Sequence, residues 1–133
     1  GHRHRPRGRP PVNIVDSCGW LEYLTNGPHA DVYAAPLTDT AALIVPSVCI
    51  AEVCKKVMTF RGEDTALEIY ALMTRGRVAP LDSPTALLAA RLGRGYGLPL
   101  ADSIILATAR SLDATLWTQN THFRTIPGVR FVI

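Results

Sequence analysis

Short apolar runs alternate with longer segments of helical spacing from residue 12 to the end of the chain. Runs rich in β-branched and apolar residues predict strands at 12–16, 43–46, 77–81, 115–118 and 129–132. Apolar residues three and four positions apart predict helices at 17–27, 29–40, 47–58, 63–76, 83–95 and 99–110, with a short turn or helix at 121–126. Strands separated by one or two helices are typical of an α/β sandwich with a mostly parallel, about five-stranded sheet.

The predicted helices begin at residues that satisfy free backbone N–H groups. Ser17, Ser47 and Ser83 each precede or open an apolar helical pattern, so each is predicted to be an N-cap. Pro84 follows Ser83 at the first helical position, where its missing N–H is harmless. Gly27 is predicted to end the first helix.

Length and composition indicate one globular domain. The chain has 133 residues, of which 47% are hydrophobic and 19% charged, so it can bury a core of its own. No apolar run approaches the roughly 18 residues that span a bilayer, and no signal-peptide pattern is present, so we expect a cytoplasmic protein without a membrane segment. Cys18, Cys49 and Cys54 are an odd number without zinc-ligand spacing, and we expect them to be reduced and mostly buried.

The net charge of +3 comes from the first eleven residues. Arg3, Arg5, Arg7 and Arg9 lie there, and without them ten basic residues face eleven acidic ones, a net charge of −1. We therefore expect a flexible basic tail at 1–11 and one domain at 12–133. A vector remnant, a truncation product and an arm that contacts nucleic-acid phosphates remain open interpretations of the tail.

Three acids fall near predicted strand ends or helix starts. Asp16 ends the first strand, and capping of the next helix is the alternative to a role in a site. Glu52 lies among apolar residues, and an intrahelical ion pair with Lys55 or Lys56 is its alternative. Asp102 lies in the first turn of its helix, where the helix dipole alone would favour it.

These acids come from three separate strand-helix units of a parallel α/β fold. Carboxylates that converge repel one another unless a divalent cation lies between them. Because no His or Cys cluster accompanies Asp16, Glu52 and Asp102, the oxygen ligands indicate Mg²⁺ or Mn²⁺ rather than zinc.

Four segments, "VDSCGWLEYL", "VPSVCIAEVCK", "GLPLADSIILATA" and "LWTQNTHF", resemble in order and spacing the motifs of PIN-domain ribonucleases, in particular VapC-type toxins of bacterial toxin–antitoxin pairs. The resemblance covers nearly all of 12–133. It implies a three-layer α/β/α sandwich in which Asp16, Glu52 and Asp102 are metal ligands, with Thr118 and Ser17 in support. Asn120 stands where the family usually has a fourth acid, which favours one Mg²⁺ (or Mn²⁺) over two.

The resemblance also implies an activity and partners. The expected activity is metal-dependent endoribonuclease cleavage of phosphodiester bonds by a metal-activated water, in transfer or ribosomal RNA. The expected partners are the RNA substrate, a second copy in a homodimer, and a small VapB-type antitoxin protein. Cations available for contacts with the RNA backbone are Lys55, Lys56, Arg91, Arg94 and Arg110.

Other functions are open but less well supported by the residues. The main alternative is a catalytically weakened PIN-like RNA-binding module, consistent with Asn120. The glycines at 93–97 follow a helix rather than a strand, which disfavours a nucleotide-binding loop. A haloacid-dehalogenase-type phosphatase would need an aspartate where Cys18 stands, and a Ser or Cys hydrolase lacks a matched histidine, since His122 is predicted to be a surface or packing residue beside Phe123.

Overall fold

The computed structural model describes residues 10–133. Most of the predicted tail, 1–11, lies outside the described residues, so its division from the domain stays a prediction. The central sheet consists of β1 (Asn13–Val15), β2 (Leu43–Pro46), β3 (Arg77–Ala79), β4 (Thr115–Thr118) and β5 (Val129–Phe131). The helices are α1 (Ser17–Leu24), α2 (Ala30–Thr38), α3 (Ser47–Arg61), α4 (Glu63–Met73), α5 (Ser83–Tyr96) and α6 (Leu100–Ser111), and short 3₁₀ turns span Thr40–Ala42 and Thr121–Phe123.

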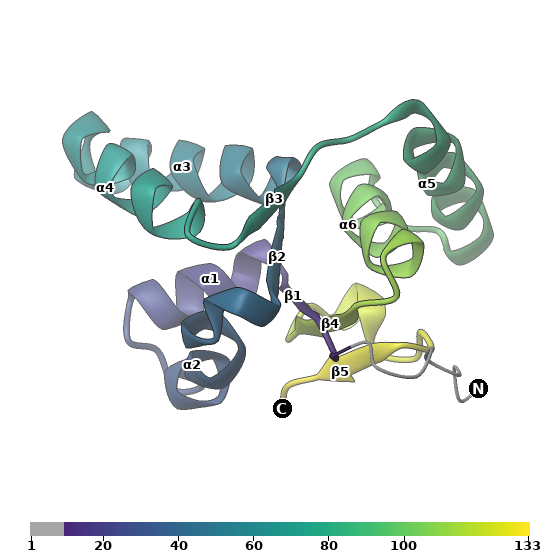
Figure 1. The fold of residues 1–133 in the computed structure, drawn as a ribbon, viewed down its shortest axis with the longest axis horizontal. Helices are drawn as coiled ribbons and strands as arrows, with labels where there is room; N and C mark the ends of the chain where they lie inside the picture. The colour runs from purple at the N-terminus through teal and green to yellow at the C-terminus, as the bar shows by residue number, and fades with distance from the viewer. Residues whose placement is uncertain (1–9) are drawn as a thin grey trace.

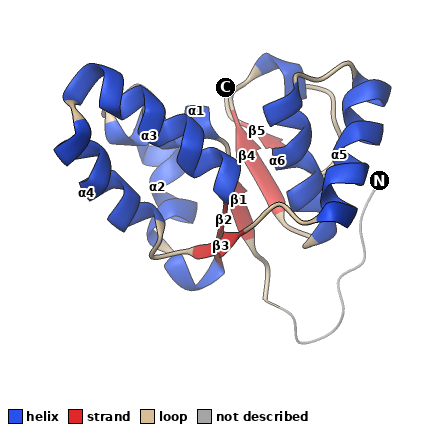
Figure 2. Ribbon diagram, turned by 90° about the horizontal axis from the view of Figure 1, so that it is seen from above, coloured by secondary structure: helices blue, strands red, loops and turns tan. Residues whose placement is uncertain are grey.

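The fold is a three-layer α/β/α sandwich, as predicted. The sheet order is β3-β2-β1-β4-β5 and every strand pair is parallel. Helices α1 to α4 lie on one side of the sheet, and α5 and α6 lie on the other (Figures 1 and 2). No helix within residues 10–133 is long and apolar enough to cross a membrane.

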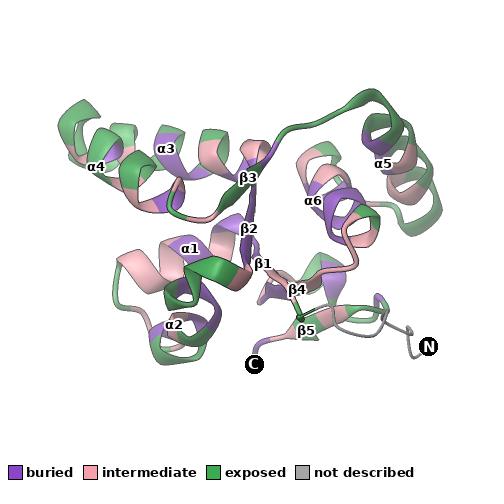
Figure 3. Ribbon diagram, in the orientation of Figure 1, coloured by how far each residue is buried: buried purple, intermediate pink, exposed green. Residues whose placement is uncertain are grey.

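The core is centred on β1 and β2, whose apolar side chains are buried by helices on both faces (Figure 3). Ile14 pairs with Ile44 on one side and Leu116 on the other, and all three are almost fully buried. Runs of this kind are expected in a parallel sheet covered on both faces. The free cysteines agree with the prediction, since Cys49 and Cys54 are buried and Cys18 is half-buried.

Strand order reverses at β1, which fixes where a site can form. The chain moves from β1 to β2 and β3 on one side, and then returns to place β4 and β5 on the other. A crevice opens at the carboxyl ends of the two strands where such a sheet changes direction, and ligands of α/β proteins bind there. In this chain Asp16 follows β1 and Thr118 ends β4 at that edge.

Helices α1, α3 and α5 begin at the predicted residues, Ser17, Ser47 and Ser83, but the predicted N-caps are wrong by one residue. Asp16, not Ser17, is the N-cap of α1, and its side chain accepts from the Ser17 N–H. Asp82, not Ser83, is the N-cap of α5, and its side chain accepts from the Thr85 N–H. Aspartate caps at least as well as serine, and the acid comes first at both positions. Ser47 is also the first residue of α3 rather than its cap, but the residue before it is Pro46, which forms no side-chain capping hydrogen bond.

Gly19 is required by the close approach of α1 to β1 and α2. A Cβ at this position would lie 2.6 Å from both Val15 Cγ1 and Tyr33 Cε1. We expect Gly19→Ala to lower the free energy of unfolding by about 1–3 kcal/mol, because both neighbours are fully buried. Gly95→Ala is the matched control: its Cβ would meet no atom within 4 Å, so urea unfolding should show a gain of about 0.5–1 kcal/mol. Equal effects at the two positions would contradict the packing argument.

Candidate active site

Asp16 lies at the junction of β1, β4 and α1 and is only 3% exposed. Its backbone N–H donates to Trp117 O at 3.0 Å, which joins it to the end of β4. Oδ1 accepts from the Ser17 N–H at 2.8 Å, and Oδ2 accepts from the Thr118 hydroxyl at 2.9 Å. Asp16 therefore caps a helix and also presents a buried carboxylate at the strand ends. The two interpretations of this residue, a helix cap and a member of a site, are compatible with each other.

Burial changes the pKa values of Asp16 and of the neighbouring Cys18. It raises the pKa of Asp16 above the ordinary value, and the negative charge of Asp102 raises it further, although hydrogen bonds from Thr118 and Cys18 oppose the shift. Burial, with the charge of Asp16, raises the pKa of the Cys18 thiol to about 11. At neutral pH Cys18 is therefore a thiol that donates to Asp16 Oδ2 at 3.3 Å, and it is not a thiolate nucleophile.

Asp102 is buried in the first turn of α6 and is held by two side chains from the segment after β4. Its Oδ2 accepts from Asn120 Nδ2 at 3.3 Å and lies 2.9 Å from His122 Nδ1. A carboxylate accepts hydrogen bonds, so the His122 tautomer with its proton on Nδ1 is the one that would donate to Asp102. The helix dipole also stabilises a carboxylate at Asp102, but it does not account for the contacts with Asn120 and His122.

His122 is a site residue that the sequence interpretation misses. The sequence predicts that it lies on the surface or packs beside Phe123, and its side chain is indeed 53% exposed, yet the ring contacts Asp102. The contact joins residues 20 positions apart and depends on the 3₁₀ turn at Thr121–Phe123. The sequence predicts a short turn or helix at 121–126, but nothing in it connects this turn to Asp102.

Asn120 and Thr118 connect the two buried acids. The Asn120 N–H donates to Thr118 Oγ1 at 2.9 Å, and the Thr118 hydroxyl donates in turn to Asp16. Asn120 Oδ1 accepts from the His122 N–H at 3.0 Å and so caps the 3₁₀ turn. Asn120 thus forms the turn expected after a strand and also lies beside Asp102.

Glu52 reaches the same region from α3 and is exposed, although its neighbours in the sequence are apolar. Its apolar neighbours Val53 and Cys54 face the core instead. Its Oε1 accepts from the Ser17 hydroxyl, adjacent to Asp16. Within residues 10–133 it forms no ion pair with Lys55 or Lys56, so the intrahelical salt bridge is not what holds it.

The three predicted metal ligands are therefore brought to one edge of the sheet as a hydrogen-bonded network rather than as a ready ligand cage. Asp16 and Asp102 interact electrostatically, and Glu52 is linked to them through Ser17. Over the part of the chain that the structure describes, no group of three or more His, Cys, Asp or Glu side chains is arranged to hold a metal ion. The assignment of Asp16, Glu52 and Asp102 as ligands remains a prediction.

Comparison with known proteins gives a consistent result. The family model described as PIN domain matches residues 14–129. No curated protein sequence matches the chain. A chain of a toxin–antitoxin complex from Klebsiella pneumoniae is similar in structure, with a TM-score of 0.75, 23% sequence identity, and coverage of 90% of this chain and 96% of the other.

Two further structures have the same fold. A chain of DNA-bound VapBC from Salmonella typhimurium has a TM-score of 0.73 and 16% identity, covering 92% of this chain and 98% of the other. VapC20 from Mycobacterium tuberculosis, described as a sarcin-ricin loop cleaving toxin, has a TM-score of 0.68 and 14% identity, covering 90% and 99%. At these identities the likeness is one of fold.

Proposed function

This chain belongs to the PIN-domain family, and from that membership we propose that it is a Mg²⁺- or Mn²⁺-dependent endoribonuclease. The observation that carries the proposal is the pair of buried acids, Asp16 and Asp102, at the edge where β1 and β4 end. The pKa of Asp16 is raised in part by the charge of Asp102, so the fold concentrates negative charge that a cation would offset.

The chemistry of the donor set suits a hard divalent cation. Asp16, Asp102 and Glu52 would supply carboxylate oxygens, which are the ligands that Mg²⁺ and Mn²⁺ prefer. When bound there, the ion would lower the pKa of a water molecule and neutralise charge that develops on the phosphoryl oxygens. This chemistry needs no side-chain nucleophile, in keeping with the protonated thiol of Cys18.

The neighbouring side chains orient the acids. The Thr118 hydroxyl holds Asp16, the Ser17 hydroxyl holds Glu52, and His122 with Asn120 holds Asp102. Each of these donors comes from a different element than the acid it holds. Fixed donors of this kind keep carboxylates in place before a substrate arrives.

We further propose that the protein is the toxin of a type II toxin–antitoxin pair that acts in the cytoplasm on transfer or ribosomal RNA. The support is the fold shared with toxin–antitoxin structures, one of which is described as a loop-cleaving toxin. A homodimer and a small antitoxin protein are proposed as partners on the same basis. On α4, Leu67 and Tyr70 are exposed whereas Met73 is buried in the core, so only the first two are available to a partner.

The test is cleavage of total RNA with mapping of the ends, with and without Mg²⁺. We expect ends with a 5′-phosphate and a 3′-hydroxyl that appear only with the metal. RNA that is bound but not cut under any divalent ion would instead support the RNA-binding module, which the amide of Asn120 keeps as the second candidate.

Restoring a carboxylate at residue 120 tests whether this position borders the metal. Asn120→Asp replaces the donor beside Asp102 Oδ2 by a second negative oxygen. Without metal we expect a loss of about 1 kcal/mol in unfolding free energy, because a hydrogen bond becomes a repulsion. With Mg²⁺ we expect the dissociation constant to fall about 10-fold in calorimetry, since ligand charge increases affinity. If neither changes, residue 120 does not border the ion.

A further inference from the structure

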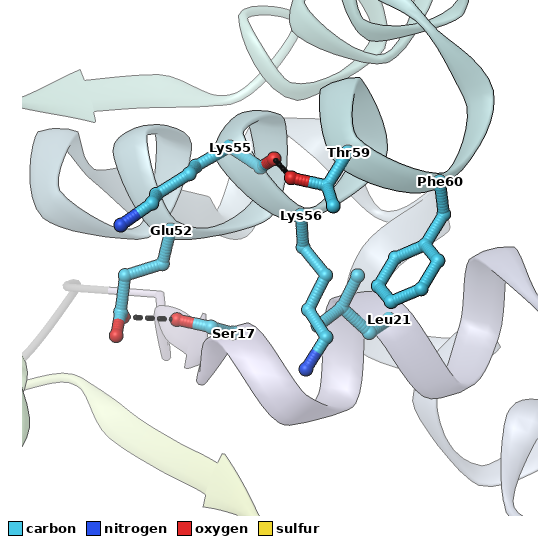
Figure 4. Close-up of a pocket in the computed structure, with 7 residues that line it drawn as sticks. All are labelled: Ser17, Leu21, Glu52, Lys55, Lys56, Thr59 and Phe60. Atoms are coloured by element: carbon cyan, nitrogen blue, oxygen red, sulfur yellow. Dashed lines mark hydrogen bonds between the residues drawn. The ribbon is translucent and has the colours of Figure 1, made fainter.

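A pocket between α1 and α3 opens directly beside the candidate active site (Figure 4). Its volume is about 510 Å³, within the range of about 300–1,000 Å³ typical of small-ligand sites. One end contains the hydrogen-bonded Ser17 and Glu52, and the other contains Leu21 and Phe60. The pocket therefore begins at a predicted metal ligand and leads away from it along α3.

Two lysines and an aromatic ring line this pocket, and their side chains are exposed rather than packed in the core. Lys55 extends on the Glu52 side, and Lys56 extends from α3 toward α1 near Leu21 (Figure 4). Both are exposed, and neither forms an ion pair with a carboxylate of the described chain. Phe60 is 73% exposed, although it is one of only three phenylalanines in the protein. Its ring is therefore available to a ligand rather than committed to the core.

We propose that this pocket is a subsite for one single-stranded RNA segment, with Lys55 and Lys56 on its phosphates and the Phe60 ring stacked on a base. The inference rests on the proposed nuclease function and extends it. Cations that follow a backbone and an aromatic side chain that accepts any base are the features by which proteins hold single strands. The body of the protein is slightly acidic, so unpaired lysines beside an acidic site match a polyanion that must approach that site.

The experiment measures binding without cleavage. The probe is a fluorescein-labelled 12-nucleotide oligouridylate in EDTA, followed by anisotropy from low to moderate salt. We expect the double variant Lys55→Gln/Lys56→Gln to bind at least about 10-fold more weakly at low salt. The slope of log affinity against log salt should fall by about 1.4, which is about 0.7 for each phosphate that a lysine no longer neutralises. Phe60→Ala should weaken binding about 5-fold without changing that slope, and Phe60→Trp should restore it.

Matched controls separate an effect of the pocket from the effect of losing positive charge or apolar surface elsewhere on the protein. Arg75→Gln/Arg77→Gln removes two exposed positive charges outside the pocket, and Met58→Ala removes an exposed apolar side chain from α3 that does not line it. Both controls should retain the affinity of the native protein within about twofold. Unchanged melting temperatures would show that all variants fold.

The outcomes distinguish the subsite from the nuclease itself. If the native protein cleaves RNA with Mg²⁺ but the pocket variants bind the oligouridylate as the controls do, the subsite is wrong, the nuclease function stands, and the pocket is left to a protein partner. If the native protein neither binds the oligouridylate nor cleaves RNA, both proposals fail. The subsite is supported if the lysine variant and Phe60→Ala both lose affinity while the controls do not, and if the salt slope falls in the lysine variant only.

Discussion

Asp102→Asn is expected to lower the rate of RNA cleavage by at least about 100-fold while leaving the unfolding free energy unchanged or higher. A metal at a phosphodiester contributes several kcal/mol to the transition state, and each 1.4 kcal/mol lost is about tenfold in rate. Stability is spared because the asparagine oxygen can still accept from His122 Nδ1, and because the substitution removes a charge that acts on the buried Asp16. Cleavage rates with saturating Mg²⁺ and urea unfolding in EDTA measure the two effects.

Asp31→Asn is the matched control, because Asp31 is also in the first turn of its helix, α2, but is exposed and outside the site. It should cost about 0.3–1 kcal/mol through the helix dipole and leave cleavage unchanged. If Asp102→Asn behaved like this control, with a loss of stability and full cleavage, Asp102 would be a structural residue and the proposed site would be wrong.

The sheet could be predicted from sequence because its signal is local. Short apolar runs such as residues 43–46 are buried on both faces, so composition alone marks them, and β2 occupies that same range. The parallel direction of the strands followed from the helices that separate them in the sequence. The predicted ranges of β1, β3 and β5 are one or two residues too long, in the centre of the sheet as well as at its edges, because the flanking residues continue the apolar or β-rich run without entering the strand pairs.

The acids were harder to place, because a site is made by tertiary contacts. The strand-end argument placed Asp16 directly after β1, as the structure has it, because that argument depends only on where a strand stops; its role as a metal ligand stays a prediction. Glu52 lies among apolar residues in the sequence, yet α3 turns Val53 and Cys54 inward and leaves Glu52 exposed, where it accepts a hydrogen bond from the Ser17 hydroxyl of another helix. His122 depends on a turn of three residues, and nothing in the sequence connects it to Asp102.

Asp16→Asn is expected to lower the rate of RNA cleavage as strongly as Asp102→Asn does, by at least about 100-fold. It is also expected to make the metal-free protein more stable at neutral pH. Burial and the charge of Asp102 raise the pKa of Asp16, so ionisation is less favourable in the folded protein than in the unfolded chain. The ionised carboxylate therefore destabilises the fold above its raised pKa, and this cost disappears as the pH falls below the ordinary pKa of an aspartate. Urea unfolding in EDTA should show the largest gain for the variant near pH 7 and a gain that shrinks as the medium becomes acidic.

Asp16→Ala separates the charge of this residue from its hydrogen bonds. Alanine also removes the desolvated charge, but it leaves the Ser17 N–H uncapped and takes the acceptor from the buried Thr118 hydroxyl. Loss of the cap costs about 0.5–2 kcal/mol, so the alanine variant should be less stable than the asparagine variant by about that amount at every pH. Both variants should be equally inactive, because neither supplies a carboxylate to the metal. An asparagine variant that cleaved RNA at the native rate would show that Asp16 serves only as a cap, and a stability gain that did not depend on pH would show that its charge is not what the fold opposes.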